Sequence, residues 1–98
     1  MRSGLVSTII PVYNRPTLVV EAIESVLAQT YRPIEIIVVD DGSTDSTSAV
    51  VEQMMTAHPE VSLLRQPNSG PGPARQKGIE AASGEFIQFL DSDDLLAP

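Results

Sequence analysis

Short apolar runs alternate with helix-length amphipathic stretches along the whole 98-residue chain. Runs rich in β-branched residues predict four buried strands, at residues 6–13, 34–39, 61–65 and 85–90. The stretches between them predict three helices, at residues 18–29, 46–55 and 73–82. In the first of these, apolar residues recur at every fourth position and beside it, which places them on one helix face.

Proline, glycine and small polar residues set the predicted helix boundaries. Pro33 is expected to interrupt the first helix, and Pro59 the second. Pro73 suits the first turn of the third helix, where a missing N–H costs nothing. Gly84 is expected to end that helix as its C′ residue. Asp45 lies among the residues that can cap the second helix.

The element order β-α-β-α-β-α-β predicts an α/β fold with three layers and a mostly parallel sheet joined by right-handed crossovers. In such sheets ligands bind beyond the carboxyl ends of the strands, where the strand order reverses. Asp40 and Asp41 follow the second predicted strand, and Asp91, Asp93 and Asp94 follow the fourth. The topology therefore brings acidic residues distant in sequence to one rim of the sheet.

This rim changes the meaning of the acidic composition. The chain has thirteen acidic and six basic residues, a formal charge of −7. Six of the acids lie at the predicted rim, which leaves the rest nearly neutral: Asp40, Asp41, Asp45, Asp91, Asp93 and Asp94. The charge argues against nucleic acid or an anionic membrane as the main partner. With 42% apolar residues the chain is globular, and without cysteine it has no disulfide, zinc–thiolate site or thiol nucleophile.

Carboxylates gathered at one edge repel one another, so we expect a cation between them. Oxygen ligands without histidine or cysteine favour Mg²⁺ or Mn²⁺ over zinc. Asp91 and Asp93 point the same way in an extended segment, so both can face one ion. The competing interpretation is that these acids are solvated turns or helix caps, as we expect for Asp45.

Other phosphate-binding patterns match poorly. The chain has no Gly-x-x-x-x-Gly-Lys-Ser/Thr loop, and Gly70-Pro71-Gly72 lacks the third glycine of a dinucleotide fingerprint. A receiver domain would carry its acidic pair after the first strand, where this chain has Pro11-Val12-Tyr13-Asn14.

Six segments in order carry a family resemblance, at residues 6–14, 25–31, 35–45, 68–75, 78–79 and 84–94. Through them the chain resembles the N-terminal half of family 2 glycosyltransferases, inverting enzymes with the GT-A fold. The resemblance covers essentially all 98 residues. It implies that residues 1–98 form the Rossmann-like, donor-nucleotide-binding part of a GT-A domain, truncated just after its Asp-x-Asp motif.

The resemblance also implies residue roles. Tyr13 packs against the nucleobase, while Asp41 with Asp40 accepts the imide N–H, which favours uracil. Arg15 and Arg75 neutralise the diphosphate. Asp93 is the direct ligand of Mn²⁺ or Mg²⁺, with Asp91 beside it. The implied donor-binding residues are Pro11, Val12, Tyr13, Arg15, Asp40, Asp41, Arg75, Asp91 and Ser92.

The implied activity is transfer of a sugar, with inversion, from a nucleoside-diphosphate sugar to the hydroxyl of a carbohydrate or lipid-linked acceptor, in cell-wall or polysaccharide synthesis. The family's general base lies beyond position 98, so no catalytic residue is assigned and the fragment alone is expected to be inactive. We expect a cytoplasmic protein, or one peripheral at the cytoplasmic membrane face.

Two alternatives stay open. One is a sugar nucleotidyltransferase, although Asn14-Arg15-Pro16 poorly replaces its Gly-rich triphosphate loop. The other is a non-catalytic α/β fragment that oligomerises. A sheet ending at its fourth strand would expose an apolar edge, so we expect self-association of the truncated fragment.

Overall fold

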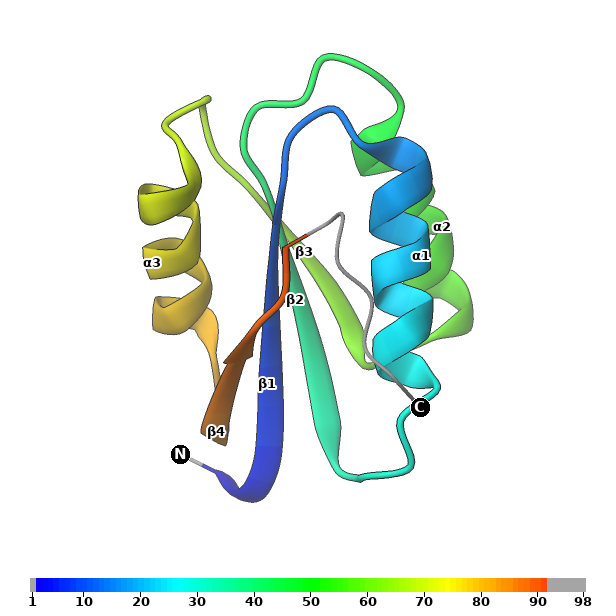
Figure 1. Ribbon diagram of the computed structural model, residues 1–98, viewed down its shortest axis with the longest axis vertical. Helices are drawn as coiled ribbons and strands as arrows, with labels where there is room; N and C mark the ends of the chain where they lie inside the picture. The colour runs from blue at the N-terminus through cyan, green and yellow to red at the C-terminus, as the bar shows by residue number, and fades with distance from the viewer. Residues whose placement is uncertain (1, 92–98) are drawn as a thin grey trace.

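A computed structural model describes residues 2–91 of the chain. Four strands alternate with three helices, as predicted (Figure 1): β1 (Arg2–Val12), α1 (Pro16–Leu27), β2 (Ile34–Asp40), α2 (Thr47–Ala57), β3 (Val61–Arg65), α3 (Pro71–Ala81) and β4 (Gly84–Phe89). The strands form one sheet in the order β3-β2-β1-β4, and every pairing is parallel. The predicted α/β architecture with a parallel sheet is confirmed.

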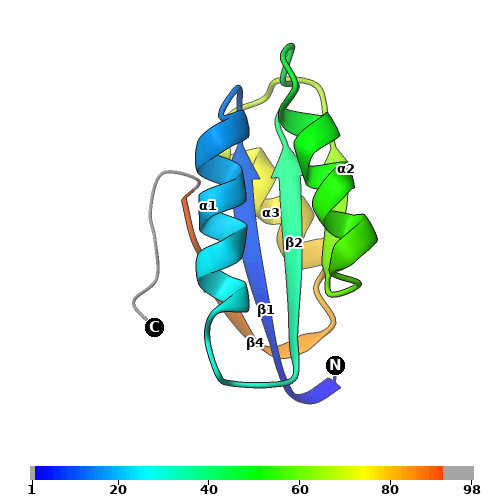
Figure 2. The ribbon, with the colours of Figure 1, turned by 90° about the vertical axis from the view of Figure 1, so that its right-hand side faces the viewer.

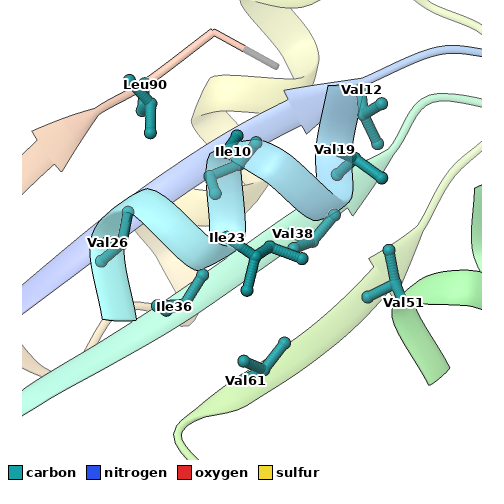
Figure 3. Close-up of a cluster of buried hydrophobic side chains, with 11 residues drawn as sticks. Ile10, Val12, Val19, Ile23, Val26, Ile36, Val38, Val51, Val61 and Leu90 are labelled. Carbon is teal, nitrogen blue, oxygen red and sulfur yellow. The ribbon is translucent and has the colours of Figure 1, made fainter. Parts of the chain in front are cut away.

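The helices cover both faces of this sheet. Helices α1 and α2 lie on one face and α3 on the other, with the sheet between them (Figures 1 and 2). On the first face Ile10 and Val38 pack against Val19 and Ile23 of α1 in the larger core cluster (Figure 3). On the second face Ile9 belongs to a smaller cluster under α3. Strands β1 and β2 are buried on both sides, which explains their continuous apolar runs.

The strand order reverses at β1. The chain steps outward from β1 to β2 and β3, then returns through α3 to place β4 on the other side of β1. The carboxyl ends of β1 and β4 therefore lie side by side at this reversal. This is the place where open α/β sheets bind ligands.

Helix α3 differs from its predicted bounds at both ends. It begins at Pro71, two positions before Pro73, and Pro71 occupies its first turn. The prediction that Gly84 ends the helix is wrong, because Ala82 is the C-cap and Gly84 opens β4. A Cβ at Gly84 would lie 2.5 Å from Ser7 Oγ. Gly84 is thus needed for the close approach of β4 to β1, and not for a helix end.

Helix α1 ends at Leu27, well before Pro33. The segment between them is closed by the Arg32 guanidinium, which donates to the carbonyls of Leu27 at 3.0 Å and Gln29 at 2.7 Å. Proline is therefore not what stops this helix.

A partly buried polar clamp, made by Glu35 and Ser7, joins the strands at the end of the sheet opposite the rim. The Glu35 carboxylate accepts hydrogen bonds from Ser7 Oγ at 2.5 Å and from the backbone N–H of Ser83 at 2.7 Å. Ser7 Oγ in turn accepts from the N–H of Gly84 at 2.9 Å. The clamp joins β1, β2 and the entry to β4, and so sets the register in which β4 runs up to Asp91.

Strand β4 is an edge strand that helices leave largely uncovered. Phe86 is 54% exposed, Ile87 43% and Phe89 46%. The apolar edge expected from the sequence is therefore present, and self-association through it stays a prediction. Within residues 2–91 no helix has the length and apolar character needed to cross a membrane.

Two glycines of α3 give a matched test of its packing. A Cβ at Gly78 would lie 2.4 Å from Cγ2 of the fully buried Ile9, whereas a Cβ at Gly72 meets nothing within 4 Å. We expect Gly78→Ala to lower the free energy of unfolding by about 1–3 kcal/mol through overpacking. Gly72→Ala should be neutral or stabilising by at most about 1 kcal/mol. Urea unfolding measures both, and equal effects would contradict the packing described.

Candidate functional site

A surface hollow of about 270 Å³ opens at the carboxyl ends of β1 and β4. Its walls come from the end of β1, the following loop, the end of β2, the start of α3 and the residue after β4. The lining residues are Pro11, Val12, Tyr13, Arg15, Asp41, Pro71, Ala74 and Asp91. The hollow thus lies at the reversal of strand order, where the topology predicts a site.

Most residues predicted for donor binding meet in this hollow, namely Pro11, Val12, Tyr13, Arg15, Asp41 and Asp91. Arg75 stands beside it and contacts Asp91. Asp40 instead lines a separate hollow next to α2. Ser92 and Asp93, with Asp94, lie outside the residues that the structure describes.

Pro71 and Ala74 are lining residues that the sequence reasoning missed. They reach the hollow because α3 begins earlier than predicted. The available signal was Gly70-Pro71, a glycine before a proline that fits the first helical position.

The loop after β1 is held rigidly against the loop after β2. Asn14 adopts a positive φ of 50°, and its N–H donates to Ser43 Oγ at 2.8 Å. Its Oδ1 accepts from the N–H of Thr44 at 2.9 Å. The N–H of Arg15 donates to Thr47 Oγ1 at 3.1 Å. Tyr13, which is 44% exposed, and Arg15 are therefore presented by a backbone that is already ordered.

The buried Asp41 carboxylate holds the loop between β3 and α3. Its Oδ1 accepts from Gln66 Nε2 and from the Ser69 N–H, both at 2.8 Å, and its Oδ2 accepts from the Gly70 N–H at 2.9 Å. The adjacent Gly42 has a φ of +81°, and a Cβ there would lie 2.6 Å from the Asn68 nitrogen. These contacts place the first turn of α3 against the end of β2.

The charge of Asp41 is stabilised by the protein itself. Burial raises the pKa of Asp41, but hydrogen bonds from Gln66, Ser69 and Gly70 together outweigh it and hold the pKa below its ordinary value. The fully buried Asp40 accepts from the Ser43 N–H at 2.9 Å and from Ser48 Oγ. N–H and O–H donors thus stabilise the charges of Asp40 and Asp41, and the predicted cation ligands remain Asp91 and Asp93.

Asp45 stands one residue before Ser46, the N-cap of α2, and its carboxylate accepts from the first helical residue. Its Oδ1 accepts from the Thr47 N–H at 2.9 Å and from Thr47 Oγ1 at 2.5 Å. These hydrogen bonds lower the pKa of Asp45. An acid of the rim is thereby accounted for by its contacts with the start of α2 alone.

Asp91 keeps the properties of a cation ligand. Its side chain is 55% exposed at the edge of the hollow, and its Oδ1 lies 3.2 Å from Arg75 Nη2. Within residues 2–91 no group of three histidine, cysteine or acidic side chains gathers in a way that could hold a metal ion. Mg²⁺ and Mn²⁺ need only one or two protein carboxylates, so this exposed oxygen ligand fits either ion.

Comparison with known proteins agrees with this geometry. The family model described as "Glycosyl transferase family 2" matches residues 7–98. The chain is 43% identical over 95 residues to "Glycosyltransferase GlyG" of Streptococcus pneumoniae, covering 96% of this chain and 32% of that protein. It is 43% identical over 98 residues to "Putative glycosyltransferase EpsH" of Bacillus subtilis, covering 100% and 28%. The chain therefore spans about a third or less of these curated relatives.

Solved structures share the fold. The mannosyltransferase PcManGT from Pyrobaculum calidifontis, in complex with GDP-Man and Mn²⁺, has a TM-score of 0.89 at 30% identity over 95% of this chain and 28% of that one. TarS 1–349 from S. aureus, in complex with UDP-GlcNAc, has a TM-score of 0.84 at 36% identity, over 92% and 27%. The Rossmann-like, GT-A architecture expected from the sequence is confirmed.

The lowered pKa of Asp41 predicts how stability depends on pH. The Asp41 carboxyl has a lower pKa in the folded chain than in the unfolded chain, so its ionised form stabilises the fold. This stabilisation is complete above the unfolded pKa of about 3.9 and is lost as the pH falls through the folded pKa. We expect Asp41→Asn to lower the free energy of unfolding at pH 7 by about 2 kcal/mol. Its stability should also vary less between roughly pH 5 and pH 3 than that of the wild type.

Urea unfolding at several pH values measures this. The control is Glu52→Gln, which removes an exposed carboxylate paired with Arg65 and should change stability by less than about 1 kcal/mol. Parallel pH profiles for wild type and Asp41→Asn would show that the Asp41 hydrogen bonds do not stabilise its ionised form.

Proposed function

The chain belongs to glycosyl transferase family 2, and on that basis we propose that its protein transfers a sugar from a nucleoside-diphosphate sugar to an acceptor hydroxyl. The observation that carries the proposal is the hollow at the strand reversal, which combines an exposed aromatic ring, an arginine and an exposed carboxylate. The named ligands of the neighbours, GDP-Man and UDP-GlcNAc, are donors of this class.

The nucleotide occupies the β1 side of the hollow. Tyr13 offers its ring to the base, above Pro11 and Val12. A carboxylate has about four acceptor positions, of which Asp41 uses three in bonds shorter than 3 Å. The fourth position accepts only a long hydrogen bond from Asn68 Nδ2, at 3.4 Å, which the imide N–H of a base can replace. We therefore infer that uracil, and UDP as the donor nucleotide, is preferred.

The diphosphate extends toward Arg15, Arg75 and Asp91. The two guanidinium groups compensate its charge, and Asp91, with Asp93, holds a divalent cation, either Mn²⁺ or Mg²⁺. When bound, that cation neutralises the negative charge that develops on the departing diphosphate. The residues named here bind and orient the donor.

We further infer an in-line displacement with inversion. The acceptor oxygen forms a bond to the anomeric carbon as the bond from that carbon to the diphosphate oxygen breaks, and the hydroxyl proton passes to a general base. We assign no residue of the 98 to that base. The chain alone should bind the donor and turn it over poorly or not at all, which agrees with its spanning about a third or less of its relatives.

The acceptor in this proposal is a carbohydrate or a lipid-linked saccharide, in cell-wall or polysaccharide synthesis. The enzyme acts in the cytoplasm or at the cytoplasmic face of a membrane. Family membership disfavours the two alternatives, a sugar nucleotidyltransferase and a non-catalytic fragment.

Calorimetric titration with UDP, with and without Mn²⁺, tests the donor site. We expect Mn²⁺ to raise UDP affinity at least about tenfold, and Asp91→Ala or Asp93→Ala to abolish this increase. Even residues that only support a metal ligand change metal affinity by about 10- to 100-fold, so loss of a ligand should have at least that effect. Glu52→Ala is the control, since Glu52 is an exposed acid paired with Arg65 and does not line the hollow. Metal-independent binding, or no binding by folded chain, would count against the proposal.

The base-binding role of Tyr13 has a matched control in Tyr31, which is 47% exposed and donates to the Gly4 carbonyl. We expect Tyr13→Ala to weaken UDP binding about tenfold through lost stacking, and Tyr13→Phe to retain it. Tyr31→Ala should leave UDP affinity unchanged. Equal losses for the two alanine variants would place the base elsewhere.

A further inference from the structure

One ion pair bridges the two sides of the candidate site. Arg75 comes from α3 and Asp91 follows β4, and Arg75 Nη2 lies 3.2 Å from Asp91 Oδ1. Their side chains are 39% and 55% exposed, so both remain accessible from solvent. Asp91 lines the hollow, and Ala74, directly before Arg75, lines it too.

The proposed function assigns these two side chains to different ligands. The Asp91 carboxylate serves the divalent cation, and the Arg75 guanidinium serves the donor diphosphate. In the structure each of these side chains is bound to the other. A cation must therefore displace Arg75 from Asp91, and a diphosphate must draw Arg75 away from the same carboxylate.

We propose that the Arg75–Asp91 ion pair couples cation binding to donor binding, an inference that rests on the proposed function. A diphosphate that takes Arg75 frees Asp91 for the cation. A cation that takes Asp91 frees Arg75 for the diphosphate. Either ligand, binding alone, must break the ion pair, whereas a ligand that binds second finds it already broken and binds more tightly. By linkage, each ligand raises the affinity of the other by the same factor.

The size of this coupling follows from the exposure of the pair. An exposed ion pair contributes little free energy, so its loss should change the affinity of each ligand by only about two- to fivefold. Direct contact between the cation and the diphosphate would add its own coupling. For this reason the decisive measurements are made with each ligand alone.

Arg75→Gln is the test variant and Arg65→Gln its control. Arg65 also forms an exposed ion pair, at 3.0 Å with Glu52, and it does not line the site hollow. The two variants make the same change in net charge and break the same kind of interaction. They differ in the carboxylate that loses its partner: Asp91 lines the site hollow and Glu52 does not.

Two titrations of the folded chain separate the outcomes. The first measures Mn²⁺ binding without nucleotide, from the electron paramagnetic resonance of free Mn²⁺, and the second measures UDP binding in EDTA by calorimetry. We expect Arg75→Gln to bind Mn²⁺ about two- to fivefold more tightly than wild type and UDP more weakly. Arg65→Gln should match the wild type in both. Loss of folding would weaken both ligands, so opposite signs cannot come from it.

Salt provides a second readout. The Mn²⁺ advantage of Arg75→Gln should shrink toward 1 M salt, where the screening length falls to about 3 Å. Mn²⁺ affinity no higher than in Arg65→Gln would overturn the coupling and leave the proposed function standing. Unchanged UDP affinity would overturn both the coupling and the role of Arg75 in donor binding. Folded wild type that binds neither Mn²⁺ nor UDP would overturn both.

Discussion

The buried carboxylate of Asp41 is the interaction on which the rim of the sheet depends. It stands at the end of β2, yet its hydrogen bonds reach forward to Gln66, Ser69 and Gly70. The start of α3 is thereby tied to a central strand of the sheet. Since Ala74 packs on Ile9 and Val39 in the smaller core cluster, the helix is fixed by polar contacts at its beginning and apolar contacts along its length.

Much of the fold could be predicted because its signals are local. Strands β1 and β2 are buried on both faces, so their apolar runs are unbroken, and such runs separated by helices imply parallel pairing. The positions of the rim residues followed from that topology. Tyr13, Arg15, Asp41 and Asp91 meet as expected because each follows or ends a strand at the same edge.

What could not be predicted depends on contacts between distant residues. Asp40 and Asp41 are adjacent and chemically identical. Only the structure shows that Asp40 bonds to the following loop and to α2, whereas Asp41 bonds to the loop between β3 and α3. Gly84 has the sequence context of a helix end, but glycine is needed there because Ser7 packs directly against it. Ser7 is 77 positions away in the sequence. Pro71 and Pro73 both suit a first helical turn, and local rules do not choose between them.

The strand order carries a consequence for how the site is acquired during folding. The pairing of β1 with β4 joins residues such as Thr8 and Gln88, 80 positions apart, whereas β1, β2 and β3 pair through much shorter connections. Closing so long a loop has the largest entropic cost among the strand pairings that the structure describes. The cavity between β1 and β4 is therefore a product of the chain's least local contact. The segment that supplies β1, β2 and β3 ends at Arg65, before three residues that line the hollow: Pro71, Ala74 and Asp91.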